Sequence, residues 1–122
     1  MKLIIAGSRN LNLDIGTIQD LIDSTIPAKV SIDEIVSGAA KGIDKSGENY
    51  AEFQGLPITR FKADWKKHGL AAGPMRNRQM AKYGDILLLI WNGESKGSLS
   101  MKKEMTKLGK PIYEIIIKGD VI

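Results

Sequence analysis

The nine residues from Ala72 to Met80 combine a predicted helix start with two closely spaced arginines. Gly73 followed by Pro74 predicts that the helix begins at Pro74, because proline has no N–H and none is needed at the first helical position. Arg76 and Arg78 then lie in the first turns, where cations oppose the helix dipole. A bound anion would resolve this conflict, because free backbone N–H groups and a guanidinium bind anions together. Alternatively, both arginines lie along the helix surface and pair with carboxylates.

Two loops of small residues have the composition of phosphate-binding loops. The candidate ligand-binding residues are Ser37, Gly38, Ala39 and Gly42 in the first loop, and Gly93, Ser95, Gly97 and Ser98 in the second. Small residues before a helix let backbone amides approach a phosphate, although neither loop has the G-x-G-x-x-G or P-loop motif. A tight strand-to-helix turn is the alternative for the first loop, and ordinary N-capping by Ser98 is the alternative for the second.

Other polar and aromatic residues also follow predicted strands. The candidates after the first strand are Gly7, Ser8 and Arg9. Asp44 and Asp64 are candidates for binding ribose hydroxyls, although Asp44 also suits helix capping. Trp65 is expected to stack on a base or to lie in an interface, whereas Trp91 is expected in the core. His68 is expected at the surface. The sequence has no cysteine and no evident cluster of metal ligands, so we expect neither a metal nor another cofactor.

Strand and helix patterns alternate along the chain and must position these residues. Apolar runs predict strands at residues 2–6, 34–37, 57–61, 85–91 and 111–117, and periodicity and end signals predict helices at residues 14–25, 44–55, 74–83 and 98–108. Gly55, Gly84 and Gly109 each follow a helix and are expected in the left-handed conformation. We predict one α/β domain over residues 1–122, a Rossmann-like three-layer sandwich with five parallel strands. The apolar first and fourth strands favour the order 3-2-1-4-5.

Composition and charge set limits on the partners. The chain is 43% hydrophobic and 26% charged, which is typical of a globular protein. A net charge of +4 favours anionic partners and is too small to indicate nucleic-acid binding. The apolar run at residues 86–91 is too short to cross a membrane, and residues 1–7 lack the features of a secretory peptide. We therefore expect a cytoplasmic protein without a membrane partner.

The order of these motifs resembles the YspA-like, cpYpsA-related branch of the SLOG superfamily. That superfamily also contains the LOG or lysine-decarboxylase-like proteins and the DNA-processing protein DprA. The resemblance is carried by residues 4–9, 36–44, 63–65, 72–80 and 91–98. It implies a Rossmann-like fold that binds nucleotides or nucleotide-derived ligands. The same branch often occurs in phages and mobile elements.

LOG proteins are phosphoribohydrolases that cleave the base from a nucleoside 5′-monophosphate, and they share the signature P-G-G-x-G-T-x-x-E and an upstream arginine. By position, Arg76 matches this arginine, and Gly97-Ser98 match the Gly-Thr of the signature. Met101 stands where the signature has its glutamate. Since methionine cannot act as an acid or a base, the resemblance supports binding more than hydrolysis. The candidates for a displaced catalytic carboxylate are Asp64, Glu94 and Glu104.

We therefore predict a module that binds a nucleotide or a nucleotide-derived small molecule, as a sensor or by sequestering it. Hydrolysis of the N-glycosidic bond and DprA-like nucleic-acid binding stay open as alternatives, although the modest charge disfavours the second. Arg76 is the expected phosphate ligand, Arg78 is expected at the surface, and Asn77 is expected to fix the loop after the fourth strand. Exposed helices are compatible with a homodimer, but the sequence has no diagnostic interface.

Overall fold

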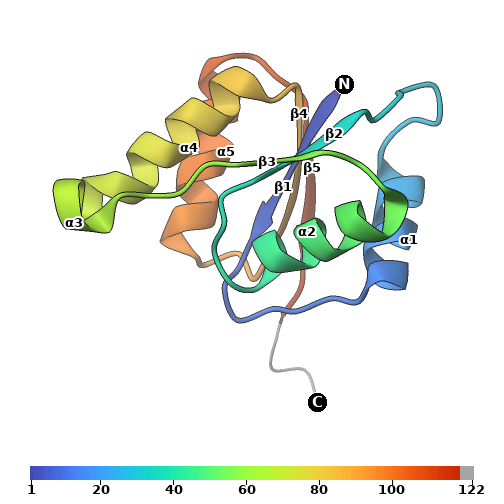
Figure 1. The fold of residues 1–122 in the computed structure, drawn as a ribbon, viewed down its shortest axis with the longest axis horizontal. Helices are drawn as coiled ribbons and strands as arrows, with labels where there is room; N and C mark the ends of the chain where they lie inside the picture. Colours follow the sequence, from blue (N-terminus) through green and yellow to red (C-terminus); the bar gives the residue numbers. More distant parts are fainter. Residues whose placement is uncertain (119–122) are drawn as a thin grey trace.

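Five parallel strands form one sheet in the order β3-β2-β1-β4-β5 (Figure 1). The structure is a computed structural model that describes residues 1–118. Its strands are β1 (Lys2–Gly7), β2 (Glu34–Ser37), β3 (Ile58–Arg60), β4 (Ile86–Trp91) and β5 (Ile112–Ile116). All four neighbouring pairs are parallel, which confirms the predicted strand order and direction. β4 is buried along its whole length, as expected for a central strand covered on both faces.

Helices cover both faces of this sheet, so the architecture is the predicted three-layer sandwich. The helical elements are α1 (Ile15–Thr25), α2 (Ile43–Gln54), α3 (Trp65–His68), the 3₁₀ turn η1 (Gly69–Ala71), α4 (Ala72–Tyr83) and α5 (Lys96–Lys107). Figure 1 shows α1 and α2 on one side of the sheet and α4 and α5 on the other, with α3 projecting beyond α4. None of the helices in residues 1–118 has the length and apolarity needed to cross a membrane.

The alternation of side chains along β1 divides the core into two layers. Leu3 and Ile5 pack in the layer under α1 and α2, whereas Ile4 and Ala6 pack in the layer under α4 and α5. Each fully buried Leu or Ile side chain contributes roughly 1.5–3 kcal/mol to folding. Gly47 lets α2 approach β1 closely, since a Cβ there would lie 2.8 Å from the Cβ of Ile5. The core therefore fixes the position of the strand ends.

Two helices begin two residues earlier than the sequence predicts. α4 begins at Ala72, so Pro74 is its third residue rather than its first. Proline is tolerated there because the first four N–H groups of a helix have no intrahelical acceptor. α5 begins at Lys96, and Ser95 rather than Ser98 is its N-cap. The correction matters, because it releases the hydroxyl of Ser98 from the capping role.

The glycines that follow the helices have two different backbone conformations. Gly55 and Gly109 have φ values of 71° and 66°, as predicted for left-handed helix ends. The prediction for Gly84 is wrong, since this residue is extended with φ −79° and ψ 163°. A Cβ at Gly84 would lie 2.5 Å from the side chain of Ile4. Glycine is therefore required there by close packing against β1 rather than by backbone conformation.

Gly7 ends β1 at the edge where the candidate loops gather. It pairs with Ile90 of β4, and a Cβ at this position would clash with the carbonyl oxygen of Ile90. The same Cβ would also lie 3.0 Å from the side chain of Ile43. The carboxyl edge of the sheet therefore depends on a residue without a side chain.

We expect Gly7→Ala to lower the free energy of unfolding by about 3 kcal/mol or more, because a backbone atom cannot move aside as a side chain does. Urea denaturation measures this change. Gly16→Ala is the matched control, because the nearest atom to its Cβ is 3.7 Å away. That variant should be as stable as the parent or slightly more stable. Equal stabilities of the two variants would contradict the prediction.

Candidate functional site

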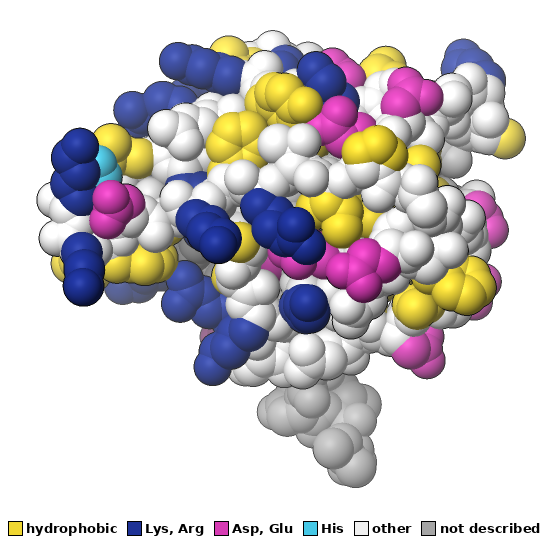
Figure 2. All heavy atoms as spheres, viewed as in Figure 1, with side chains coloured by type: hydrophobic (Ala, Val, Ile, Leu, Met, Phe, Trp, Pro, Cys, Tyr) yellow, Lys and Arg dark blue, Asp and Glu magenta, His cyan; other side chains and the backbone are white. Residues whose placement is uncertain are grey.

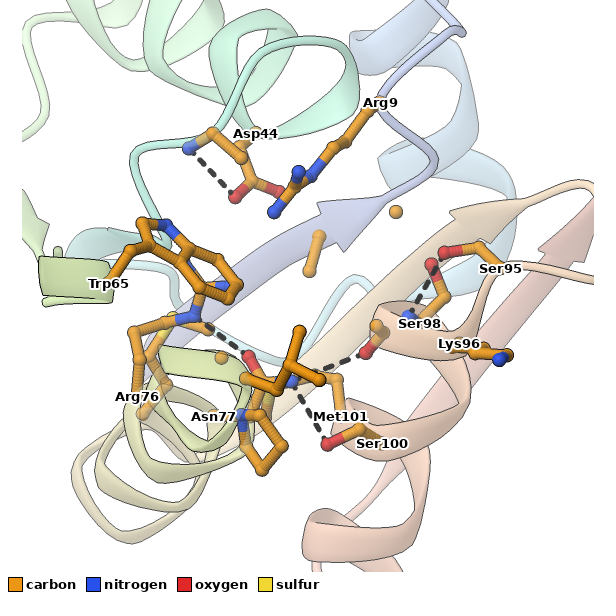
Figure 3. Close-up of a pocket in the computed structure, with 18 residues that line it drawn as sticks. Arg9, Asp44, Trp65, Arg76, Asn77, Ser95, Lys96, Ser98, Ser100 and Met101 are labelled. Carbon is orange, nitrogen blue, oxygen red and sulfur yellow. Dashed lines mark hydrogen bonds between the residues drawn. The ribbon is translucent and has the colours of Figure 1, made fainter. Parts of the chain in front are cut away.

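A cavity of about 440 Å³ opens at the carboxyl edge of the sheet, between the end of β1 and the first turns of α2, α4 and α5. The predicted ligand-binding residues that line it are Gly7, Arg9, Asp44, Trp65, Arg76, Asn77, Ser95, Gly97 and Ser98. In Figure 3, Arg76 and Trp65 lie on one side of the open space, and Ser95 and Ser98 lie on the other. Its size is within the usual range for small-molecule sites.

Arg76 is held rigidly at the first turns of α4. Its Nε donates to Oδ1 of Asn77 at 2.9 Å, and its Nη1 donates to the carbonyl oxygen of Gly38. A Cβ at Gly38 would lie 2.7 Å from a carboxylate oxygen of Asp44 and 2.9 Å from Nη1 of Arg76. The small residue after β2 is therefore what lets the guanidinium and the carboxyl group come together.

Asn77 links α4 to α5. It is buried, and its Nδ2 donates to the carbonyl oxygen of Gly97 and to Oγ of Ser100, both at 3.2 Å. Because its Oδ1 also accepts from Arg76, one carboxamide sets the distance between the guanidinium and the first turn of α5. This is the geometry expected of a residue that fixes the segment after the fourth strand.

The first turn of α5 presents donors without acceptors. Oγ of Ser95 accepts from the N–H of Ser98 at 3.3 Å, and this leaves the Ser98 side chain free for other contacts. Ser98 is only 3% exposed and lines the cavity, yet its Oγ has no hydrogen-bond partner within residues 1–118. Helix geometry also leaves the N–H groups of Lys96 and Gly97 without intrahelical acceptors. The positive end of the helix dipole adds to this turn's attraction for anions.

Asp44 places a buried carboxyl group in the same cavity. It is 6% exposed, and its Oδ2 accepts from the N–H of Ala40 at 3.2 Å. Burial raises its pKa to about 6, although this hydrogen bond and the nearby Arg76 act in the opposite direction. The group therefore changes its protonation state close to neutral pH. Burial also lowers the pKa of Arg76, while Asp44 acts to raise it.

A second cavity of about 340 Å³ adjoins the first on the side of β2 and β3. Its charged lining residues are Arg9, Lys41, Lys62 and Arg76. Trp65 borders both cavities, and the guanidinium carbon of Arg9 lies 5.6 Å from the centroid of the Trp65 ring. This distance is within the range of a cation–π interaction. The predicted residues Gly38 and Ala39 line this second cavity rather than the first.

The remaining predicted loop residues lie outside both cavity linings and have local structural roles. Oγ of Ser8 accepts from the N–H of Asn92 at 3.1 Å, and Oγ of Ser37 donates to Glu48 at 2.6 Å. Gly42 is the N-cap of α2 and has a φ of 81°, and Gly93 has a φ of 87°. These residues shape the loops that carry the cavity walls.

The three candidates for a displaced catalytic carboxylate also lie outside the linings of both cavities. Asp64 is exposed and is the N-cap of α3, a short helix that the sequence analysis missed. Glu94 is exposed in the loop before α5. Glu104 pairs with Arg78 at 3.7 Å and with Lys107 at 3.5 Å, which places Arg78 at the surface as expected. Sequence analysis also missed Lys62, although its position two residues after β3 was a usable signal.

The chain is similar to known proteins. The family described as the YspA, cpYpsA-related SLOG family matches residues 1–68, which contain β1, β2 and the Gly38 loop. The chain belongs to this family. Its membership indicates a role in binding or processing nucleotide-related ligands. This SLOG protein is also similar to Gene 61 protein of Mycobacterium phage D29, with 30% identity over 117 aligned residues. The match covers 91% of this chain and 93% of the relative. No solved structure matches the chain significantly.

The raised pKa of Asp44 predicts a specific pH dependence of stability. The folded state holds this proton up to about pH 6, whereas the unfolded chain loses it near 3.8. The free energy of unfolding should therefore fall as the pH rises through this interval, by about 3 kcal/mol for this group. Urea denaturation of the parent and of Asp44→Asn at about pH 4 and at about pH 7 measures the effect. The variant should show a smaller fall, and two parallel profiles would exclude Asp44 as the cause.

Proposed function

We propose that this SLOG protein binds a nucleotide or a nucleotide-derived small molecule in the first cavity, with a phosphate group between Arg76 and the first turn of α5. The observation that carries the proposal is the hydroxyl of Ser98, which is buried in a residue that lines the cavity and has no hydrogen-bond partner within residues 1–118. A buried polar group without a partner costs about 1–3 kcal/mol. A phosphate oxygen that accepts from this hydroxyl would remove the cost.

The surrounding donors suit a phosphate. The N–H groups of Lys96 and Gly97 point out of the first turn of α5, and the guanidinium of Arg76 lies across the cavity. A guanidinium matches the geometry of phosphate oxygens and keeps its charge when it is partly buried. Asn77 holds both sides at a fixed separation, so the phosphate enters a preformed site.

The rest of the cavity suits a nucleoside. Asp44 lines the cavity and would accept a hydrogen bond from a ribose hydroxyl, whereas the other ribose candidate, Asp64, is exposed and caps α3. Met80 and Met101 form an apolar part of the lining. The ring of Trp65 is 47% exposed at the rim and is available for stacking on a base. A ligand with an anionic, a hydroxylated and a flat apolar part would use all three regions.

Hydrolysis of the N-glycosidic bond is the second candidate, and Asp44 is the observation that favours it. Among the described residues, Asp44 is the carboxylate that lines the first cavity, and its pKa of about 6 suits proton transfer. Met101, however, is 1% exposed and occupies the lining where the LOG signature has glutamate. We therefore propose binding without hydrolysis.

The variant Ser98→Ala tests the contribution of this hydroxyl to ligand affinity separately from its contribution to stability. We expect the affinity for nucleoside 5′-monophosphates to fall by about tenfold or more, because a hydrogen bond to a charged acceptor contributes about 1.5–3 kcal/mol. The stability of the unliganded variant should stay the same or rise, since an unpartnered buried hydroxyl is removed. Thermal shift with four nucleoside monophosphates, followed by calorimetry, measures both quantities. No stabilisation of the parent at millimolar ligand would overturn the proposed function.

Gly97→Ala and Gly16→Ala provide a matched pair for this test. Each glycine is the second residue of its helix, at α5 and α1, and a Cβ has room at both positions. Both substitutions should therefore leave the fold intact or stabilise it slightly. Only Gly97→Ala places a methyl group beside the proposed phosphate, so only this variant should lose affinity. An equal loss in both variants would argue against a phosphate at α5.

We expect no enzymatic release of base from nucleoside 5′-monophosphates, because the cavity has Met101 at the signature position. Chromatography of the reaction mixture at neutral pH should show the same free base with and without the protein. Base release by the parent that disappears in Asp44→Asn would instead establish hydrolysis with Asp44 as the acid or base.

A further inference from the structure

The second cavity is lined by four cationic side chains that form no salt bridge in the part of the chain that the structure describes. Arg9, Lys41, Lys62 and Arg76 line it, and its lining contains no Asp or Glu among the described residues. None of these four side chains forms a salt bridge within residues 1–118. Figure 2 shows many of the Lys and Arg side chains of this face over the side of the molecule where α3 and the carboxyl edge lie. The lining of the second cavity therefore concentrates positive charge, while the carboxyl group of Asp44 lies near Arg76 in the lining of the first cavity.

The two cavities adjoin each other. They share Arg9, Ala40, Trp65 and Arg76 in their linings. Arg76 therefore stands at their junction, with Ser98 on the side of the first cavity and the two lysines on the side of the second. A ligand that extends past Arg76 would therefore reach from the first cavity into the second.

The two arginines also repel each other. Burial lowers the pKa of Arg76, the charge of Asp44 acts to raise it, and the charge of Arg9 acts to lower it. Arg9 is held against the face of Trp65 instead of against a carboxylate. An anion between the arginines and the lysines would relieve this repulsion and would gain charge-assisted hydrogen bonds. In the free protein, hydrogen bonds hold Arg76, and Arg9 lies against the ring of Trp65.

We propose that the second cavity binds a second phosphate of the same ligand, so that nucleoside 5′-diphosphates or compounds with the same pyrophosphate link bind more tightly than monophosphates. The proposal rests on the proposed function, because the first phosphate and the nucleoside occupy the first cavity. Lys41 and Lys62 contact the second phosphate alone, whereas Arg76 contacts both. The two lysines therefore determine the preference for two phosphates over one.

The test compares mono- and diphosphates of all four nucleosides, and phosphate with pyrophosphate, by calorimetry without divalent cations. In the parent, diphosphates should bind about tenfold more tightly or better. Lys41→Ala/Lys62→Ala should remove most of this preference and leave monophosphate affinity nearly unchanged. Both lysines are exposed, so the variant keeps the fold. Lys29→Ala/Lys103→Ala is the matched control, because it removes the same charge from exposed positions outside both cavities.

The outcomes separate the two proposals. Monophosphate binding with equal diphosphate affinity would overturn the second subsite and leave the proposed function in place. A diphosphate preference that survives in Lys41→Ala/Lys62→Ala, or that falls equally in the control, would also overturn it. Failure of every nucleotide and of pyrophosphate to bind would overturn both. Loss of preference in the lysine variant alone supports the second subsite.

Discussion

The hydrogen bonds of Arg76 and Asn77 join three segments that are distant in the sequence. Arg76 donates to Gly38 after β2 and to Asn77 beside it, and Asn77 donates to Gly97 in α5. A guanidinium and a carboxamide that are partly or fully buried must have such partners, because unpaired polar groups are expensive inside a protein. The same bonds that satisfy these groups also fix the width of the cavity. The hydrogen bonds that satisfy these polar groups therefore also build the site.

Close backbone approach makes this arrangement sterically possible. Gly38 leaves room for Arg76 beside Asp44, and Gly7 leaves room for β4 beside β1. Gly47 has the same effect one layer away, where α2 packs on Ile5. Each of these glycines has a negative or extended φ, so each is required by a neighbour rather than by its own backbone conformation. Their positions indicate that the carboxyl edge tolerates few changes in side-chain volume.

The order of the sheet was predictable because burial on both faces gives β1 and β4 nearly continuous apolar runs. The approximate site was predictable because parallel strands bring their carboxyl ends together. The details depend on longer-range contacts. Ser95 and Ser98 are equally good N-caps in sequence, and only the observed bond from Ser98 N–H to Ser95 Oγ distinguishes them. Glycine at position 84 is required by its close packing against Ile4, which is far away in the chain, so the usual helix-end rule did not apply there.

The charge distribution explains why phosphates, rather than the base, are expected to dominate recognition. The two proposed phosphate positions are surrounded by Arg9, Arg76, Lys41, Lys62 and the first turn of α5. Asp44 supplies the carboxylate in the first cavity. The apolar wall at Met101 offers shape and contact but no directional hydrogen bond, and methionine adapts easily to different rings. A glutamate in that wall would repel the phosphates of the proposed ligand. Under the proposed function, Met101 therefore leaves the anion site without that repulsion and without the acid or base of the LOG signature.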